Sequence, residues 1–236
     1  MIYITGDTHR NIKRFMHGNA EFIHDMTWTK DDVLIVCGDF GFVFYDTPEE
    51  HDMLDWFEKN KPYTICFVDG NHENHPRLAE YPLEEWHGGK IHRIRKNVIH
   101  LMRGQVFNIQ GHKIFAMGGT YSIDRSMRTL GYSYWQEEIP CDAEYKEAIE
   151  NLRKHNFNID YAVTHTAPKE IIIQMGYIPD PHDYELTGFF EYVMYECKDS
   201  VKGWFFGHWH EDREIYGGKF RGLLNDVVSI SQEKQS

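Results

Sequence analysis

The chain has 236 residues, of which 41% are hydrophobic and 15% aromatic, enough to bury the core of one large domain. Its formal net charge of -12 excludes the basic footprint of a duplex nucleic-acid binder, and no apolar run approaches the roughly 18 residues that a membrane span needs. The four cysteines form no CxxC pair, which argues against a disulfide framework and against a zinc ribbon.

The N-terminal third alternates between apolar strands and helices. Strands are predicted at Met1–Thr5, Val33–Cys37 and Tyr63–Val68, with helices between them at Asn11–Trp28 and Pro48–Asn60. The second helix begins with proline and two acidic residues, which is a helix N-terminus signal. Because the strands are continuously apolar rather than alternating, we expect a parallel sheet that is covered on both faces.

The middle of the chain has a different pattern, with short and closely spaced strands that suggest antiparallel pairing. These strands are predicted at Lys90–Ile94, Asn97–Met102, Gln105–Ile109 and Lys113–Met117. A polar loop follows at Gly118–Pro140. Helices are then predicted at Asp142–Asn156, with Asp142 as N-cap, and at Tyr184–Cys197, and strands at Tyr161–Val163, Gly203–Phe206, Arg213–Tyr216 and Lys219–Leu224. We expect one domain over residues 1–230 and a polar tail at 231–236.

Five of the predicted strands end in residues that can bind a metal. These residues are Asp7 and His9, Asp39, Asn71 and His72, His165, and His208 and His210. In sheets built from strand–helix units, ligands bind outside the carboxyl ends of the strands, so we expect these side chains to meet at one rim. Imidazole with carboxylate or amide oxygen suits Mn, Fe, Zn, Ni or Co. Each motif alone is weak, but all five in this order form a specific signal.

With these motifs, the chain resembles the calcineurin-like metallophosphoesterase superfamily over positions 6–210. The matching segments are Gly6-Asp7-Thr8-His9, Gly38-Asp39, Gly70-Asn71-His72-Glu73, Thr164-His165 and Gly207-His208-Trp209-His210. The resemblance implies an α/β fold in which two mixed β-sheets pack as a sandwich flanked by helices. It implies two divalent metal ions, one held by Asp7, His9 and His210, the other by Asn71, His165 and His208, with Asp39 bridging both.

The resemblance also implies an activity. The expected reaction is hydrolysis of a phosphodiester or phosphomonoester by a hydroxide that bridges two metal ions, with Mn favoured over Fe, Zn, Ni or Co. His72 would protonate the leaving oxygen or contact the phosphate. We expect a phosphate-ester substrate and no membrane partner. The N-terminus has neither the basic nor the apolar region of a signal peptide, which predicts a cytoplasmic enzyme.

The chain departs from the protein Ser/Thr phosphatases of this superfamily, which carry GDxVDRG and RGNHE. Phe42 and Val43 stand in place of the Asp-Arg pair, and Asp69 stands in place of the arginine before GNHE. Bidentate arginine holds a dianionic monoester well, so its loss favours a small or nucleotide-type diester. The candidates for supplying arginine from elsewhere are Arg10, Arg77, Arg125 and Arg128, of which the last two stand in the polar loop.

Two alternatives stay open at this point. The first is a phosphomonoesterase, including a protein phosphatase-like enzyme, that uses non-standard arginines. The second is a metal-binding scaffold without turnover. The aromatic residues Tyr132, Tyr134 and Trp135 either line a substrate pocket or pack the second sheet. The remaining histidines are expected at the surface or in satisfied turns: His17, His24, His51, His75, His87, His92, His100, His112, His155 and His182.

Overall fold

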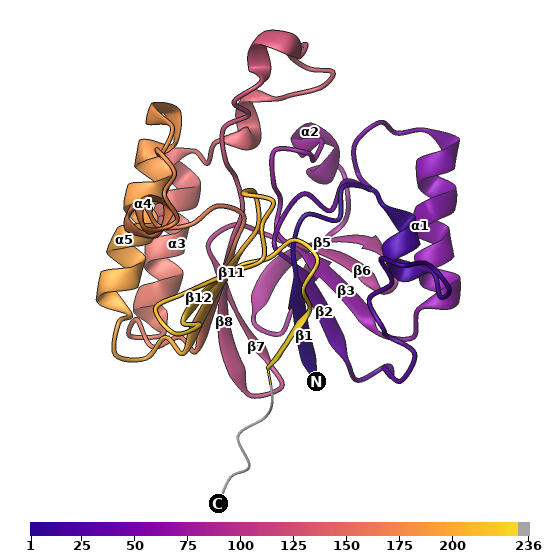
Figure 1. Cartoon of the computed structure of the whole chain (residues 1–236), viewed down its shortest axis with the longest axis horizontal. Coiled ribbons are helices and arrows are strands. Elements are labelled where there is room, and N and C mark those ends of the chain that lie inside the picture. Colours follow the sequence, from indigo (N-terminus) through magenta and orange to yellow (C-terminus); the bar gives the residue numbers. More distant parts are fainter. Residues whose placement is uncertain (231–236) are drawn as a thin grey trace, which may run out of the picture.

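The computed structural model describes residues 1–230, which fold into two β-sheets packed face to face with helices on both outer faces (Figure 1). Within these residues the first sheet has seven strands, in the spatial order β13 (Val228–Ile230), β1 (Ile2–Thr5), β2 (Val33–Val36), β3 (Thr64–Phe67), β6 (Val98–Leu101), β5 (Gly89–Arg95) and β4 (Leu83–Trp86). Strands β1, β2, β3 and β6 are parallel neighbours, whereas β13, β5 and β4 pair antiparallel. The polar tail predicted at 231–236 lies outside the described residues.

The second sheet, again counted over residues 1–230, has six strands. Their spatial order is β11 (Arg213–Ile215), β12 (Phe220–Gly222), β10 (Gly203–Phe206), β9 (Tyr161–Thr164), β8 (His112–Met117) and β7 (Gln105–Ile109). The pairs β12–β10, β10–β9 and β9–β8 are parallel, and the two outer pairs are antiparallel. The structure therefore confirms the predicted sandwich of two mixed sheets.

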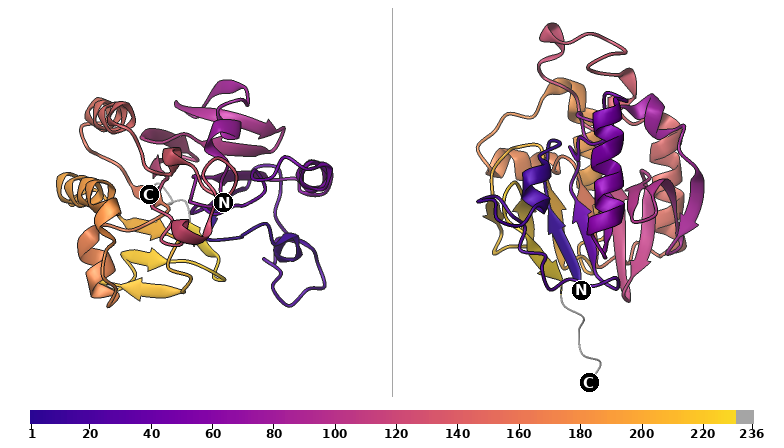
Figure 2. Two further views of the ribbon diagram at one scale, coloured as in Figure 1. Left: turned by 90° about the horizontal axis from the view of Figure 1, so that it is seen from above. Right: turned by 90° about the vertical axis from the view of Figure 1, so that its right-hand side faces the viewer.

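Helices cover the outer face of each sheet, as the views from above and from the side show (Figure 2). The helix α1 (Pro48–Asn60) packs on the seven-stranded sheet, and α3 (Asp142–Lys154) and α5 (Tyr184–Glu196) pack on the six-stranded sheet. Shorter helical segments lie in the connections: α2 (His75–Leu78), α4 (Lys169–Gln174), η1 (Ile12–Phe15), η2 (Arg125–Met127), η3 (Gln136–Glu138) and η4 (Pro181–Asp183). No helix among residues 1–230 is long and apolar enough to span a membrane.

The continuous apolar runs in the strands follow from this layering. Successive side chains of a strand point to opposite faces of the sheet, so a sheet covered on both sides needs apolar residues at every position. In β2, Val33 and Ile35 pack between the two sheets, whereas Leu34 and Val36 pack under α1. In the six-stranded sheet, Ile114 faces the other sheet and the next residue, Phe115, faces the helices.

One predicted helix is wrong. Of residues 11–28, all of which the structure describes, only Ile12–Phe15 is helical, as a short 3-10 turn. The Asn11 side chain accepts a hydrogen bond from the Lys13 amide, and the chain turns at Gly18, where φ is +90°. Arg14 points inward and donates to the Gly6 carbonyl oxygen at 2.8 Å. The apolar residues of this segment are therefore buried by an irregular loop rather than by one face of a helix.

Smaller differences occur at element ends. Cys141, not Asp142, is the N-cap of α3, and its amide donates to the Glu144 carboxylate at 2.8 Å. The strands β4 and β13 and the helix α4 were not predicted, because each is only three to six residues long and has no clear period. The polar loop at 118–140 rises beyond the body of the protein at the top of Figure 1 and contains η2 and η3.

Candidate metal centre

The predicted metal ligands stand in the loops that follow β1, β2, β3, β9 and β10, at one rim of the two sheets. Five of them have left-handed backbone conformations, with φ values of 43° at Asp7, 44° at His9, 49° at Asp39, 68° at His208 and 52° at His210. Residues other than glycine rarely adopt positive φ, and strained backbone of this kind concentrates at functional sites. The chain turns sharply after each strand and directs these side chains toward one another.

The glycines that precede Asp39 and Asn71 allow this close approach. Gly38 has φ +79°, and a Cβ atom there would collide with the His165 imidazole. A Cβ atom at Gly70 would collide with the Asp39 carboxylate. Only a residue without a side chain fits such positions, which explains why the motifs read Gly-Asp and Gly-Asn.

The first group of donors consists of Asp7, His9, Asp39 and His210, whose ligand atoms all lie within 4.8 Å of one another. His9 Nε2 is 2.8 Å from His210 Nε2 and 3.7 Å from Asp39 Oδ2. Asp7 Oδ1 accepts a hydrogen bond from the His208 amide at 3.0 Å, but its buried Oδ2 has no hydrogen-bond partner. Asp7 Oδ2 is thus a buried carboxylate oxygen that no hydrogen-bond donor satisfies, and it lies close to two imidazoles. This combination is suited to binding a divalent cation.

The second group is centred on His165, which is fully buried. Its Nδ1 donates to the Cys37 carbonyl oxygen at 2.9 Å, because a carbonyl can only accept. In the neutral form of the ring, this bond leaves the lone pair on Nε2, which faces Asn71 Oδ1 at 3.2 Å and Asp39 Oδ1 at 3.4 Å. The His208 ring lies beside it, with 5.1 Å between the ring centroids. A backbone partner on the second nitrogen is the usual way of orienting a metal-binding histidine.

The charge states of these groups suit a cation. Burial lowers the pKa of His9 to about 4 and that of His208 to about 3, so both imidazoles are neutral and have a free lone pair. Burial raises the pKa of Asp7 to about 7, and nearby His165 opposes the rise. Burial also acts to raise the pKa of Asp39, but His165, His72 and His9 together outweigh it and the pKa is lowered. Buried carboxylates without a matching positive charge attract a divalent ion.

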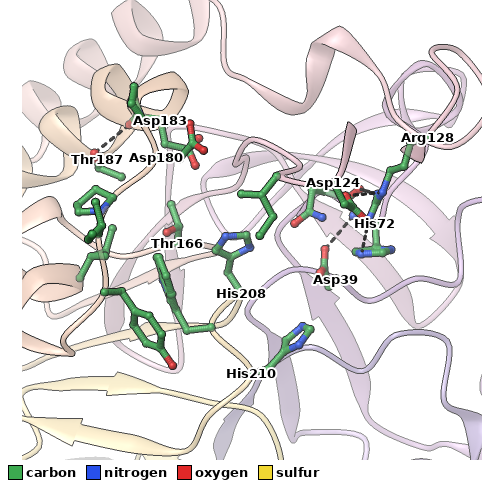
Figure 3. A pocket seen from close by; sticks show the side chains of 18 residues that line it. Asp39, His72, Asp124, Arg128, Thr166, Asp180, Asp183, Thr187, His208 and His210 are labelled. Atoms are coloured by element: carbon green, nitrogen blue, oxygen red, sulfur yellow. Dashed lines mark hydrogen bonds and ion pairs between the residues drawn. The ribbon is translucent and has the colours of Figure 1, made fainter. Parts of the chain in front are cut away.

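His72 lies beside this centre without being one of the seven donors. Its amide donates to Asp39 Oδ1 at 2.8 Å, and its Nε2 is 2.9 Å from Arg128 Nη2 (Figure 3). Because a guanidinium only donates, Nε2 accepts this bond and the ring proton is on Nδ1. Arg128 is held in turn by Asp124, with Nε 2.7 Å from Oδ1. Burial lowers the pKa of His72, while Asp39 opposes the shift.

The other candidate arginines have different surroundings. Arg10 pairs with Glu49 at 3.3 Å and borders a shallow cavity beside His9 and His72. Arg125 bonds to buried Glu138 at 2.9 Å and stacks on Tyr121, away from the donors. Arg77 pairs with the buried carboxylate of Glu50 at 2.9 Å. Arg128 is therefore the candidate that contacts the centre, and the roles of Arg10 and Arg125 stay predictions.

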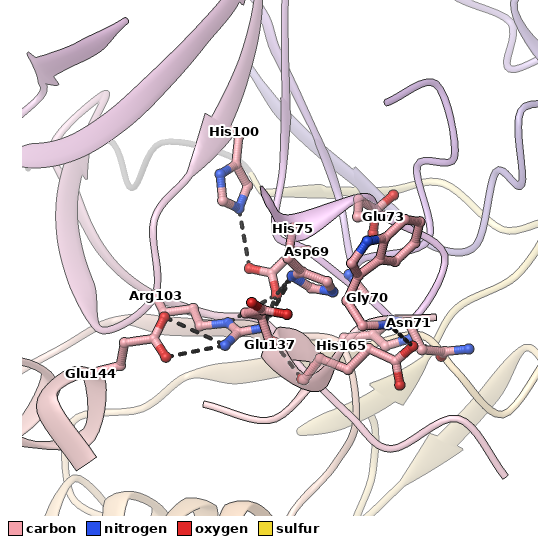
Figure 4. Close-up of polar contacts among 12 residues, drawn as sticks. Asp69, Gly70, Asn71, Glu73, His75, His100, Arg103, Glu137, Glu144 and His165 are labelled. Atoms are coloured by element: carbon pink, nitrogen blue, oxygen red, sulfur yellow. Dashed lines mark hydrogen bonds and ion pairs between the residues drawn. The ribbon is translucent and has the colours of Figure 1, made fainter. Parts of the chain in front are cut away.

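A buried polar network supports the loop that carries Asn71 (Figure 4). Arg103 binds Asp69 Oδ2 through Nε at 2.9 Å and Nη2 at 2.5 Å, and His100 Nε2 is 3.1 Å from Asp69 Oδ1. Arg103 Nη2 also donates to the carbonyl oxygens of Glu137 at 2.8 Å and Glu138 at 3.2 Å, in the polar loop. Burial acts to raise the pKa of Asp69, but Arg103 and His100 hold it well below its usual value.

The structure corrects one expectation about the histidines and shows supporting residues that were missed. His75, His100 and His112, expected at the surface or in turns, are buried. The position of His100 within the apolar strand Val98–Leu101 was the signal that could have revealed it. Arg103 and Glu73 were not predicted to have roles. Glu73 accepts from the Gly41 amide at 2.8 Å and the Gly70 amide at 2.5 Å, so it joins the loops that carry Asp39 and Asn71.

The family model for the calcineurin-like phosphoesterases matches residues 1–212. The chain belongs to this family. It is therefore a phosphate ester hydrolase of a family that depends on divalent metal ions, with Asp7, His9, Asp39 and His210 as a candidate metal-binding cluster. No curated protein matches the chain. Among solved structures, it is similar to a phosphopantetheinyl hydrolase from Mycobacterium tuberculosis, with 14% identity, a TM-score of 0.45, and coverage of 94% of this chain and 87% of that chain.

A cavity of about 610 Å³ opens beside the candidate metal centre of the phosphoesterase. Its walls include Asp39, Asn71, His72, His208 and His210 at one end. Arg128 is the cation among the lining residues, and it reaches His72 from the polar loop (Figure 3). The cavity therefore brings the candidate metal donors, the imidazole of His72 and one guanidinium together in its lining.

Proposed function

We propose that this phosphoesterase uses two divalent metal ions and prefers a small or nucleotide-type phosphodiester. The observation that carries the proposal is the position of Asp39, whose two carboxylate oxygens face two different groups of donors. Oδ2 lies 3.7 Å from His9 Nε2, and Oδ1 lies 3.4 Å from His165 Nε2. A carboxylate between two donor sets suits a pair of cations that share one ligand.

In this proposal Asp7, His9 and His210 hold one ion, Asn71, His165 and His208 hold the other, and Asp39 contacts both. When bound, two such ions act as Lewis acids on the phosphoryl oxygens and lower the pKa of water. The donors are nitrogen and oxygen atoms, which favours Mn and is compatible with Fe, Zn, Ni or Co. The left-handed backbone at five of these residues holds their side chains in place before any ion or substrate arrives.

The remaining residues of the site have roles of their own. Without substrate, Arg128 orients the His72 ring through Nε2. With an ester bound, Arg128 contacts the phosphoryl group instead, Nε2 takes up a proton from water, and the resulting imidazolium protonates the leaving oxygen. The preference for a diester rests on the shortage of positive charge, because Arg128 is already paired with Asp124. A dianionic monoester needs more compensation than a monoanionic diester, which a single shared guanidinium does not supply.

Hydrolysis of two chromogenic esters tests the proposal. With Mn²⁺ added, we expect the purified chain to hydrolyse bis-p-nitrophenyl phosphate with a kcat/KM at least about tenfold above that for p-nitrophenyl phosphate. A tenfold preference corresponds to about 1.4 kcal/mol, which is the free-energy difference we assign to the uncompensated second charge of the monoester. Treatment with EDTA should abolish turnover, and elemental analysis should count two Mn per chain after reloading. A preference for the monoester would favour the phosphomonoesterase, and bound metal without hydrolysis of either ester would favour the scaffold.

Substitution of His72 separates the leaving-group role from metal binding. We expect His72→Ala to lower kcat by about 10²–10⁴-fold, because a general acid contributes that much, while the metal content stays unchanged. The matched control is His17→Ala, which removes an exposed histidine and should leave kcat within twofold. Loss of a metal from the His72 variant would show that this side chain is a ligand instead.

A further inference from the structure

The cavity beside the metal donors also has an apolar part of its lining, to which the reaction at the phosphorus assigns no role. This part of the lining consists of Ile123, Ile172, Tyr177, Ile178, Pro179 and Trp209. Trp209 stands in the chain between His208 and His210, and its ring stacks on Tyr177 with 4.6 Å between the centroids. The apolar wall is therefore continuous with the metal donors, so a group bound against it lies next to a phosphate held at those donors.

Most of the charged groups that line the cavity are acidic. Besides Asp39, the carboxylates that line the cavity are Asp124, Asp180 and Asp183. Asp124 pairs with Arg128, and Asp183 accepts hydrogen bonds from the Thr120 hydroxyl at 2.9 Å and the Tyr121 amide at 2.8 Å. Arg128 is the single lysine or arginine among the described residues that line the cavity. A second phosphate on the substrate would meet carboxylates there without a partner of opposite charge.

Two isoleucines at the mouth of the cavity are unusually exposed. Ile178, after α4, is 88% exposed, and Ile123, in the polar loop, is 74% exposed. They come from segments far apart in the chain yet line the same cavity. Aliphatic side chains gain free energy when they leave water, so an apolar group bound between them is stabilised.

We propose that Ile123, Tyr177, Ile178 and Trp209 form a subsite for an uncharged apolar or aromatic group of the ester, and that this subsite disfavours substrates with a further anionic group there. This inference rests on the proposed function, because it places the scissile phosphate at the metal donors. The occupant is the part of the substrate that remains attached to phosphorus or leaves with the ester oxygen. Its chemistry, apolar and without charge, follows from the lining residues.

Binding of phosphonates to the Mn-loaded full chain tests the subsite without relying on turnover. By calorimetry we expect phenylphosphonate to bind at least about tenfold more tightly than methylphosphonate, as expected for burial of a ring against an apolar wall. The ring with a carboxylate, 4-phosphonobenzoate, should lose most of that advantage. Ile178→Asp should weaken phenylphosphonate about tenfold and change methylphosphonate less than twofold. The control Ile173→Asp alters an isoleucine of α4 that is 53% exposed and does not line the cavity, and should change neither affinity.

Other outcomes overturn the subsite. Equal affinities for phenylphosphonate and methylphosphonate would contradict the subsite. An equal loss of affinity for both compounds in Ile178→Asp, or the absence of binding by either compound, would contradict it too. Failure of the proposed function gives a different result. If phenylphosphonate binds selectively but neither p-nitrophenyl ester is hydrolysed, the subsite stands and the proposed activity is wrong. If the esters are hydrolysed but the phenyl group gives no advantage, only the subsite is wrong.

Discussion

Asp39→Ala is expected to abolish metal-dependent ester hydrolysis. Asp39 is buried, and its carboxylate faces His9 through one oxygen and His165 through the other. Removal of a partner that only orients a metal ligand costs about 10–100-fold, so loss of a ligand shared by two ions should lower kcat/KM by more than about 100-fold. Elemental analysis should show that at least one of the two expected ions is lost.

The control for this substitution is Asp52→Ala, which removes an exposed carboxylate from α1 and should keep the full activity and metal content. The circular dichroism spectrum of Asp39→Ala should match that of the unmodified chain, because the substitution leaves the packing of both sheets in place. The His72 amide does lose its acceptor, so its loop is the part expected to loosen. Full activity in Asp39→Ala would rule out the shared-ligand arrangement.

Arg103→Ala is expected to cause the largest loss of stability. The guanidinium of Arg103 is buried against the carboxylate of Asp69, which is 1% exposed. Breaking a buried ion pair by removing one partner costs about 3–5 kcal/mol, because the remaining charge has no compensation. For a chain of this length each kcal/mol corresponds to roughly 2–4 °C, so Tm should fall by about 6–20 °C.

Activity should fall together with stability in Arg103→Ala, because Arg103 also donates to the carbonyl oxygens of Glu137 and Glu138. These bonds fasten the polar loop that carries Arg128 to the loop that carries Asn71. Urea unfolding measures the free-energy change, with Arg153→Ala on the exposed face of α3 as the control. In the double variant Asp69→Asn with Arg103→Ala, part of the loss should be regained, since no unpaired buried charge is left. A loss below 1 kcal/mol in Arg103→Ala would contradict this account.

The sequence determined the parts of this protein that depend on local pattern. Apolar runs of four or five residues mark β1, β2 and β3 because each strand is covered on both faces. The residues just past the strand ends belong at one rim because parallel strands point the same way. The glycines before Asp39 and Asn71 belong to the same local pattern, because only a residue without a side chain permits the close approach of these loops.

Only the tertiary structure decided which side chains meet across those loops. The apolar spacing of residues 11–28 resembles a helix, yet Arg14 and the turn at Gly18 direct the segment into a loop. The contact of Arg128 with His72, and the burial of His100 with Arg103 around Asp69, join residues that are 31 to 56 positions apart. Such pairings depend on how distant segments pack, and the hydrophobic periodicity of a single segment contains no information about that packing. For that reason the meeting of the candidate metal donors at one rim was predictable from the sequence, whereas the supporting network and the apolar lining of the cavity were not.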